Sequence, residues 1–554
     1  MVGVFKSRLI FLGSFLIGLF NCLLVTHFRT LQPTSIDWLS HGPNTDPIQA
    51  YLGWKFFRSG GWSIPLGSNP RFGELTSNSI AYSDSLPILA LPFKLIEGYL
   101  PSEFQYFGIW LLISCVMFTY FVMKILILYK LKRSEIYLGC ALISFSPIML
   151  SRINIHFALA GQFLLVAALY FSLKSVKGIP VSIANWLILL IAAFLTHGYL
   201  FFMSLIFFIF DQLLQCRRNY ITKKDWLVYI FLTLVTLLVV GKWVVGYSSF
   251  APADNSTNYW GASGWNLLSP FYPNGWSQLL RNLPTGKGNI DTAPYFGLGI
   301  CLCILIASAL IAKRFSFYRI LSIVSGYRYL VSALLLLTLF AITNRISVGN
   351  TVVELPFPKS FVDIFSPFRA SARMSWPLLF AVAIGSVIVI SRTLTKTIGT
   401  ILLVTLCAVQ YADTWPGWRS EFAAMTSSSV FEVEAESSWR ELSAHYSRLV
   451  VVPDKVGETP GWPSIAVIAA KFGMTTNSAY LARVQKQEFI NMRQKIIKEL
   501  RGGNPRRDTI YVLSNEMQIG WAKGLVRENS MHAITKVGGF QVLLPYAKNF
   551  TPRI

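Results

Sequence analysis

Long apolar runs separated by short polar turns dominate the first three quarters of the chain. A helix needs about 20 apolar residues to cross the hydrocarbon core of a bilayer, which is about 30 Å thick. We therefore predict a mostly α, polytopic membrane protein with about eleven membrane-spanning helices. The predicted spans are 9–25, 106–129, 135–150, 157–173, 183–195, 199–214, 226–246, 295–313, 327–343, 375–391 and 398–412.

The turns between these runs differ in charge from one side to the other. When the N-terminus is placed in the cytoplasm, every inward turn is basic, among them KLKR at 130–133 and RRNYITKK at 217–224. The outward turns lack such clusters, except for Arg369 and Arg373. This agrees with the excess of Lys and Arg in cytoplasmic loops of membrane proteins. The same alternation places the C-terminus and every long loop outside, namely 28–84, 247–294 and 344–374.

Two apolar segments are ambiguous. Residues 85–99 contain two prolines, a lysine and a glutamate, so we expect an interfacial or re-entrant helix on the outer face rather than a full crossing. The runs 183–195 and 199–214 are joined by Thr196-His197-Gly198, which looks like a turn, although the pair also fits one long kinked helix.

The tail has a different pattern from the rest of the chain. Strand-like runs (RLVVVP, DTIYVLSN, FQVLLP) alternate with helix-like ones (IAVIAAKFG, QEFINMRQKIIKEL), which favours a soluble α/β domain. We divide the chain into a transmembrane domain, 1–414, and an outer α/β domain, 415–554. No Rossmann glycine fingerprint, P-loop or nucleophile elbow occurs in the tail. Packing over the outer face and acceptor recognition both remain open as its role.

Composition adds three constraints. The chain has 554 residues, 53% hydrophobic and only 14% charged, which is far less charge than a soluble protein of this length carries. The net charge of +23 is spread over many turns, so we expect no nucleic-acid partner. The seven cysteines lie in or beside the predicted spans, which disfavours a disulfide framework or a structural zinc site. Aromatic residues of the 247–294 loop suit either a binding surface or a membrane-interface belt.

The first outer loop carries acidic residues whose position beside the membrane requires an explanation. An ionised carboxylate at a membrane surface is costly unless it is paired or used. We interpret Asp46 as the catalytic base of a membrane glycosyltransferase. The following Pro47 places Asp46 at a loop-to-helix junction, where a simple helix cap is the alternative. Asp84 is either a second catalytic acid or another cap, and Glu74 is either a substrate contact or a solvated loop acid. Asp37 completes the group.

Outside the cytoplasm no nucleotide sugar is present, so we expect a lipid-linked sugar phosphate as donor. Arginine and lysine suit its phosphate, with lipid headgroups and snorkelling as the alternative reading of these cations. The turn before the run 375–391 holds Arg369 and Arg373, whose spacing puts both on one face if the turn is helical. The other candidates in outward turns or at the outer end of a span are Arg152 and Lys242 for phosphate, and His156 and His197 for substrate. We expect no metal site and no cofactor.

These segments resemble known families. The architecture is similar to the GT-C class of integral membrane glycosyltransferases, and the motifs DPIQAYLGWKFFRSGGWSIPLG, SIAYSDSLPILALPFK and FRASARMSWP resemble the bacterial DUF6311 family across the whole chain. The GT-C resemblance implies inverting transfer from a polyprenyl-phosphate sugar to an envelope glycan or lipid, with the first-loop Asp46 as base, in the bacterial inner membrane. Many GT-C enzymes carry a paired acidic motif in this loop, whereas Asp46 stands between Thr45 and Pro47.

Other functions remain open. A transporter or flippase for lipid-linked glycans would be expected to show broken helices and internal repeats, and no clear repeat is present. A polymerase or ligase that joins lipid-linked glycans is close in chemistry. The third alternative is a non-catalytic envelope assembly protein that uses the tail as an interaction module.

Overall fold

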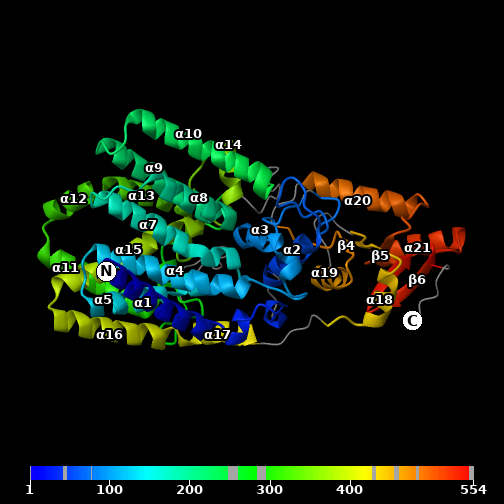
Figure 1. Cartoon of the computed structure of the whole chain (residues 1–554), viewed down its shortest axis with the longest axis horizontal. Coiled ribbons are helices and arrows are strands. Elements are labelled where there is room, and N and C mark those ends of the chain that lie inside the picture. Colours follow the sequence, from blue (N-terminus) through cyan, green and yellow to red (C-terminus); the bar gives the residue numbers. More distant parts are fainter. Residues whose placement is uncertain are drawn as a thin grey trace. The chain divides into compact units, whose positions relative to one another are not determined.

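The computed structural model describes residues 2–40, 46–76, 78–246, 260–282, 295–426, 432–453, 461–481 and 486–547. Contacts between Cα atoms divide the chain into two compact units, each described by itself (Figure 1). The first unit contains Met1–Ser35, Glu103–Leu238 and Asn255–Ser427, and the second contains Ile36–Ser102, Val239–Asp254 and Ser428–Ile554.

The first unit is a helical bundle. In it α4 packs against α1, α5 and α7, while α11 packs against α15 and α16. Its main helices are α1 (Val2–Val25), α4 (Phe107–Leu128), α5 (Arg133–Ser144), α6 (Pro147–Leu150), α7 (Phe163–Val176), α8 (Ile183–Thr196), α9 (Gly198–Arg217), α10 (Lys223–Val239), α11 (Leu298–Arg314), α12 (Phe317–Gly326), α13 (Arg328–Ile342), α14 (Lys359–Phe365), α15 (Trp376–Thr393), α16 (Lys396–Asp413) and α17 (Trp415–Thr426).

Shorter elements connect these helices. They comprise 3-10 helices η1 (Phe28–Leu31), η4 (Phe157–Gln162), η6 (Ser269–Phe271), η7 (Ser366–Phe368) and η8 (Ser371–Ser375), and the antiparallel hairpin of β1 (Arg345–Val348) and β2 (Thr351–Glu354). The hairpin, α14 and η7 all fall in the segment 344–374, so this predicted outer loop contains regular structure.

The number of membrane spans is smaller than eleven. Among the residues that the structure describes, five helices are long and apolar enough to cross a membrane, or up to seven if each of two bent helix pairs is one span. Each predicted run does contain a helix, but several helices are too short. At about 1.5 Å per residue, the 14 residues of α8 reach only about 21 Å, less than the hydrocarbon thickness. The prediction of eleven spans is therefore not supported.

Prolines and bends interrupt other predicted spans. The predicted span 135–150 breaks because α5 ends at Ser144 and Pro147 opens the separate helix α6, since proline disfavours helix in the residue before it. The pairs α11–α12 and α16–α17 bend by 116° and 53°. By contrast, α8 and α9 are two separate helices, which is one of the two possibilities for the Thr196-His197-Gly198 segment. His197 caps the start of α9, since its Nδ1 accepts from the Tyr199 amide at 3.1 Å.

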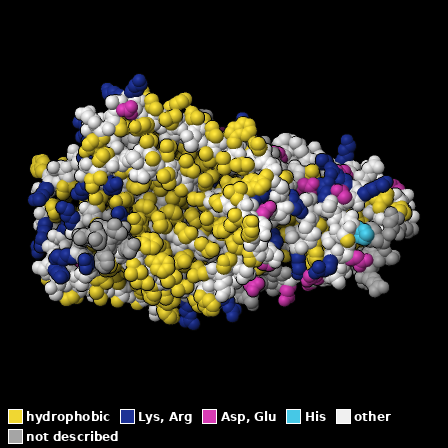
Figure 2. Space-filling view, in the orientation of Figure 1, with side chains coloured by type: hydrophobic (Ala, Val, Ile, Leu, Met, Phe, Trp, Pro, Cys, Tyr) yellow, Lys and Arg dark blue, Asp and Glu magenta, His cyan; other side chains and the backbone are white. Residues whose placement is uncertain are grey.

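Side chains divide the surface of the first unit by type. Figure 2 shows a broad field of hydrophobic side chains over the bundle, with Lys and Arg gathered at one end. The residues of that end include the last turn of α11, with Lys313 and Arg314, and Arg392, whose guanidinium donates to the Tyr129 carbonyl at 2.8 Å. The bundle therefore has one strongly basic end, as the turn charges predicted.

The second unit is built around a five-stranded sheet of order β4-β3-β5-β7-β6. β3 is parallel to β4 and β5, whereas β7 is antiparallel to β5 and β6. Its elements are η2 (Asp37–Ser40), α2 (Asp46–Ser59), α3 (Pro87–Leu95), η3 (Glu97–Tyr99), η5 (Val240–Val245), α18 (Glu436–Ser443), β3 (Arg448–Val451), α19 (Trp462–Lys471), β4 (Thr475–Thr476), α20 (Lys486–Arg501), β5 (Thr509–Leu513), α21 (Glu516–Glu528), β6 (Ala533–Val537) and β7 (Phe540–Leu544).

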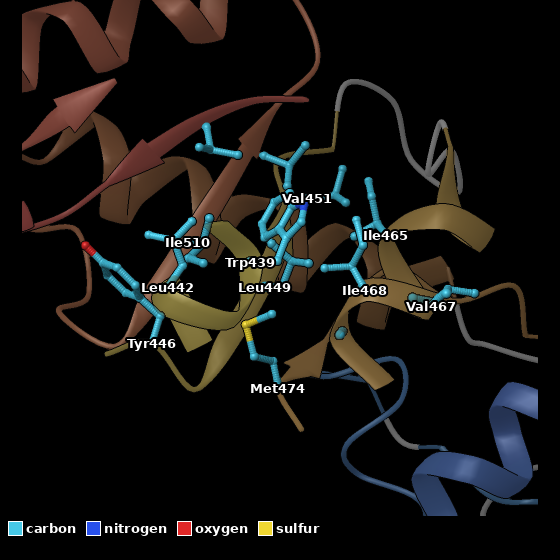
Figure 3. Close-up of a cluster of buried hydrophobic side chains, with 14 of the residues drawn as sticks. Trp439, Leu442, Tyr446, Leu449, Val451, Ile465, Val467, Ile468, Met474 and Ile510 are labelled. Carbon is cyan, nitrogen blue, oxygen red and sulfur yellow. The ribbon is translucent and has the colours of Figure 1, made fainter. Parts of the chain in front are cut away.

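Alternation along the strands gives this sheet an apolar core on each face. Leu449 and Val451 of β3 join the core that α18 and α19 cover, shown in Figure 3. Val450, between them, joins the core beneath α20 and α21, because successive strand residues point to opposite faces. The predicted α/β pattern of the tail is present, with its three strand-like runs forming β3, β5 and β7.

The first core also includes residues from the far N-terminal part of the chain. Ile48, Leu52 and Phe56 of α2 and Phe72 of the following loop belong to the same buried cluster as Trp439 of α18, and α2 packs against α19. The first loop, which the sequence analysis placed with the transmembrane domain, is thus a structural part of the second unit. Conversely, α17, the start of the predicted outer domain, belongs to the first unit.

Candidate functional site

The candidate residues fall into two groups, one in each unit. Asp46, Asp84, Glu74 and Lys242 belong to the second unit, and the two histidines and three arginines belong to the first.

Asp46 lies at the junction that its sequence predicted. It is the first residue of α2, with Pro47 directly after it, and its side chain is half-buried. Asp84 is also half-buried and has a left-handed φ of 52°. It does not cap α3, because the residue at that cap is Leu86.

The turn that carries Asp84 packs on the first half of α2. The Ser85 hydroxyl donates to the Ala50 carbonyl at 2.7 Å, and Gln49 Nε2 donates to the Tyr82 carbonyl at 3.3 Å. A Cβ at Gly53 would lie 2.1 Å from Ser83 Oγ, so glycine is needed for this close approach. Asp84 is therefore held next to the helix that Asp46 begins.

Glu74 is engaged in a structural contact. Its carboxylate forms an ion pair with Arg448 of β3 and accepts from the Thr475 hydroxyl of β4 at 2.7 Å. The Glu74 amide donates to the Thr476 carbonyl at 2.8 Å. Glu74 thus fastens the first loop to the edge of the sheet rather than lying solvated in a loop.

Lys242 lies in η5, the π-helical turn that follows α10. Its side chain is exposed, and its ammonium group is 5.1 Å from the centre of the Trp243 ring. The turn is tied to the first loop, since the Gly67 amide donates to the Val244 carbonyl at 2.7 Å. The structure thus places Lys242 in a turn that contacts the first-loop backbone.

In the first unit, Arg373 and His197 meet the same aromatic ring. The Arg373 guanidinium is 5.1 Å from the centre of the Tyr199 ring, and the His197 ring is 5.4 Å from it. The Tyr199 hydroxyl accepts from the Ala370 amide at 2.9 Å, which fixes the segment before α15. Arginine stacked on an aromatic face keeps its fork of N–H donors available at the edge.

Arg369 and Arg373 do not share a helical face. The segment consists of η7 and η8, and the backbone leaves helical geometry at Ala370, with φ −91° and ψ 57°. Arg369 is exposed, whereas Arg373 is half-buried. The shared face was predicted on the condition that the segment is helical, and the break at Ala370 means that this condition is not met.

Arg152 lies close to the same segment. Only 6% of it is exposed, and its guanidinium is 6.0 Å from the centre of the Trp376 ring, three residues beyond Arg373. His156 precedes η4, and its amide donates to the Arg152 carbonyl at 3.1 Å. Arg152, Arg373 and His197 therefore gather around the first turn of α15, at the opposite end of α15 from the basic residue Arg392.

Sequence reasoning missed an acid in this cluster, Glu421 of α17. Its carboxylate is hydrogen-bonded by Asn154 and lies in the field of Arg152. Its other oxygen, Oε2, is buried, and no residue in the described part of the chain hydrogen-bonds to it. A signal was available, because Glu421 is an acid within the apolar helix pair α16–α17, yet it lies 375 positions after Asp46 in the chain.

Asp413, at the end of α16, is a buried acid with a structural role and not a candidate for the site. This fully buried carboxylate accepts from the Tyr295 hydroxyl at 2.7 Å, from the Leu298 amide at 3.1 Å and from the Ser277 hydroxyl. A buried charge satisfied in this way holds structure together. Asp413 fixes the start of α11 and the described part of the loop before it.

That loop uses its tryptophans for packing. Trp260, Trp265 and Trp276 are all buried. The Trp260 ring lies 5.6 Å from Phe340 and 5.6 Å from Phe365, and the Trp265 indole donates to the Ser269 hydroxyl at 2.9 Å. These three side chains form neither of the two surfaces expected of this loop. Other residues of the aromatic motif, such as Tyr259, lie outside the described residues.

The described residues bring no three His, Cys, Asp or Glu side chains together as a metal site would require. What the first unit does provide is a cluster of one buried arginine, Arg152, with a second arginine, an imidazole and a carboxylate that are half-buried. Such a set can bind an anion through the arginines and exchange a proton through the carboxylate or imidazole. The second unit supplies one acid at the start of α2, Asp46, and a second, Asp84, in a turn that packs on the same helix.

The fold and these clusters define a helical membrane-type protein with a polar site at helix ends and an α/β domain. Comparison with models of protein families identifies the family. Residues 15–415 match the domain of unknown function DUF6311, and residues 438–545 match the DUF6311 C-terminal domain. The chain belongs to the DUF6311 family. A search of curated proteins finds no match.

Proposed function

We propose that this protein is an inverting membrane glycosyltransferase of the GT-C class, which moves a sugar from a polyprenyl-phosphate donor to an envelope glycan or lipid. The observation that carries the proposal is the cluster of Arg152, Arg373, His197 and Glu421 in the first unit. Buried charges gathered at one end of an apolar bundle mark a functional site by default. Two arginines suit a phosphate leaving group better than any neutral ligand.

The membrane topology follows from the same proposal. The basic end of the bundle faces the cytoplasm, in keeping with the charge asymmetry of membrane proteins. The cluster and the second unit then face the outside of the bacterial inner membrane, where polyprenyl-phosphate sugars are the available donors. This orientation assigns the turns of α8–α9 and η8–α15 to the outer surface.

The proposed reaction is a single displacement. Asp46 accepts the proton of the acceptor hydroxyl as that oxygen bonds to the anomeric carbon of the sugar. The bond between the anomeric carbon and the phosphate oxygen breaks with its electron pair, leaving polyprenyl phosphate. Arg373 and Arg152 stabilise the negative charge of the departing phosphate, and Asp84 orients the acceptor. His156, His197, Arg369 and Lys242 contribute binding contacts.

The test is transfer by the purified protein in liposomes that contain an undecaprenyl-phosphate hexose with a radiolabelled sugar. We expect label to leave the lipid for an acceptor from an envelope extract, and unlabelled undecaprenyl phosphate to accumulate. A flippase would move labelled lipid across the bilayer without cleaving it. An assembly protein would do neither, and either result would overturn the proposal.

Arg373 provides the residue-level control for this assay. Arg373→Ala should lower transfer about a hundredfold, as expected for a lost charge-assisted contact in the transition state. Arg319→Ala is the matched control, because Arg319 also stacks on an aromatic ring, 5.2 Å from the centre of Phe315, but lies at the basic end. Equal effects of the two substitutions would remove Arg373 from the site.

A further inference from the structure

The first unit has an apolar groove that the proposed reaction does not use. Its volume is about 470 Å³, and it lies between three helices, α1, α5 and α16. Small side chains make the room: Ala141, Cys407 and Ala408 are opposed by larger ones on α1. The complete lining is Leu16, Ile17, Phe20, Ala141, Cys407, Ala408 and Tyr411.

The groove is bounded at both ends by contacts of α1. Toward the N-terminus, Gly13 approaches α5 so closely that a Cβ would lie 2.5 Å from the Tyr137 ring. Toward the C-terminus, Asn21 donates to the Ser144 hydroxyl at 2.8 Å and accepts from the Tyr411 hydroxyl at 2.6 Å. The separation of eight positions from Gly13 to Asn21 corresponds to about 12 Å of helix. Between these two contacts, α1 leaves a gap that protein does not fill.

The gap opens on a surface suited to hydrocarbon. Leu16 and Phe20 are 55% and 54% exposed, and further along α1 Phe11 and Leu12 are exposed as well. An empty apolar gap forfeits dispersion contacts along its whole lining. In a bilayer, an acyl chain of a surrounding lipid can fill this gap.

A cationic end lies beyond the groove. The Tyr411 carbonyl, at the groove, accepts from the Trp418 indole at 3.2 Å. The Trp418 ring meets the Trp415 ring edge to face, with 4.5 Å between their centres, and the Arg419 guanidinium lies 5.8 Å from the centre of the Trp415 ring. Arg29 follows α1 in η1, and the neighbouring His27 ring lies 5.9 Å from Phe422 of α17.

Both arginines are exposed. The nearby acids are engaged elsewhere, Asp413 with the start of α11 and Glu421 with Asn154. Trp and Arg at the end of a membrane helix suit the headgroup region of a bilayer. The end of the groove is therefore complementary to an anionic headgroup.

We propose that this groove binds one anionic phospholipid of the bilayer, with an acyl chain between α1 and α16 and its phosphate at Arg29 and Arg419. The lipid fastens α1 to the bundle between its two direct contacts. This inference is independent of the proposed sugar transfer, because it concerns lipid retention and not the reaction.

Native mass spectrometry of the detergent-purified full chain tests the proposal, with phosphatidylglycerol and phosphatidylcholine as probes. We expect one phosphatidylglycerol per chain to be retained in preference to phosphatidylcholine. Ala408→Trp fills the floor of the groove and should weaken phosphatidylglycerol binding about tenfold or more. Removing Arg29 or Arg419 should weaken it about fivefold each. Ile401→Trp, on the exposed face of α16 and outside the groove lining, should have no effect.

Crosslinking of the wild-type chain avoids any dependence on the folding of a variant. Phosphatidylglycerol with a diazirine in its acyl chain should label peptides that contain Leu16, Phe20 or Tyr411. The proposal is overturned if label spreads evenly over exposed helices, or if phosphatidylcholine is retained equally. Displacement by equimolar undecaprenyl phosphate would also overturn it, since the groove would then belong to an isoprenoid lipid.

Discussion

In α10 of the first unit, Leu234 and Leu238 expose 49% and 68% of their surfaces, whereas in the sheet of the second unit Leu449 and Leu543 expose none. Leucine is exposed over much of α10, whereas the strands of the sheet bury theirs. A surface that exposes one large apolar side chain after another is suited to a membrane, and a sheet with an apolar core on each face is suited to water. The comparison separates the two environments along one chain.

The largest difference should come from a lysine on each surface. Leu234→Lys puts a charge at the middle of α10 and should disfavour membrane insertion by about 3 kcal/mol. Met517→Lys, at a residue of α21 that is 53% exposed, should change stability by less than about 0.5 kcal/mol. Membrane-integrated protein after carbonate extraction measures the first, and thermal unfolding the second. Equal tolerance of both lysines would contradict the assignment of α10 to the bilayer.

A smaller effect should follow from loosening the first loop. Glu74→Gln removes the charge that pairs with Arg448, of which only 8% is exposed, and should destabilise this contact by about 2 kcal/mol. Hydrogen exchange of residues 68–76 should then become faster by more than tenfold.

Glu436→Gln is the matched control for Glu74→Gln. Glu436 also pairs with an arginine, Arg440, but the pair is exposed, and exposed pairs contribute little. Exchange of residues 68–76 should therefore be unchanged in this variant. Unchanged exchange in Glu74→Gln would show that the ion pair does not hold the loop.

The smallest predicted effect concerns pH. Burial holds the pKa of His532 below its usual value of 6.5, and its Nδ1 accepts from the Tyr546 amide at 3.1 Å. The unfolded chain therefore takes up this proton first, so the stability of the second unit is complete above pH 6.5 and falls as the pH drops below it. His532→Asn should flatten this fall between pH 6.5 and pH 5 in thermal unfolding curves. An identical slope in both proteins would exclude His532 as the cause.

The sequence indicated helix positions and the α/β tail because hydrophobic period and turn residues are local signals. It failed on the number of spans, since Pro147 and the bend after Arg314 shorten helices whose composition alone looks sufficient. It could not place the first loop in the second unit, because Ile48, Leu52 and Phe56 form an apolar stripe that would suit any core. Long-range packing decides which core receives it.

The same limit applies to the candidate site. Asp46 and Asp84 were recognised because they interrupt a loop beside apolar segments, and the Ser83–Ser85 turn does hold Asp84 next to α2. For Glu74 the sequence offered a substrate contact or a solvated loop acid, and neither interpretation included its partner Arg448, far along the chain. Glu421 was missed for the corresponding reason, because its partners Arg152 and Asn154 are far from it in the sequence and lie beside it only in the folded chain.

The most direct test of the proposed function compares Asp46→Asn with Asp37→Asn in single-turnover transfer from labelled undecaprenyl-phosphate hexose. Both residues begin a helical segment of the second unit, so the pair controls for charge loss and for folding. We predict that Asp46→Asn slows transfer about a thousandfold, within the range expected for loss of a general base, while Asp37→Asn transfers at the wild-type rate. Transfer by Asp46→Asn at the wild-type rate would contradict the account.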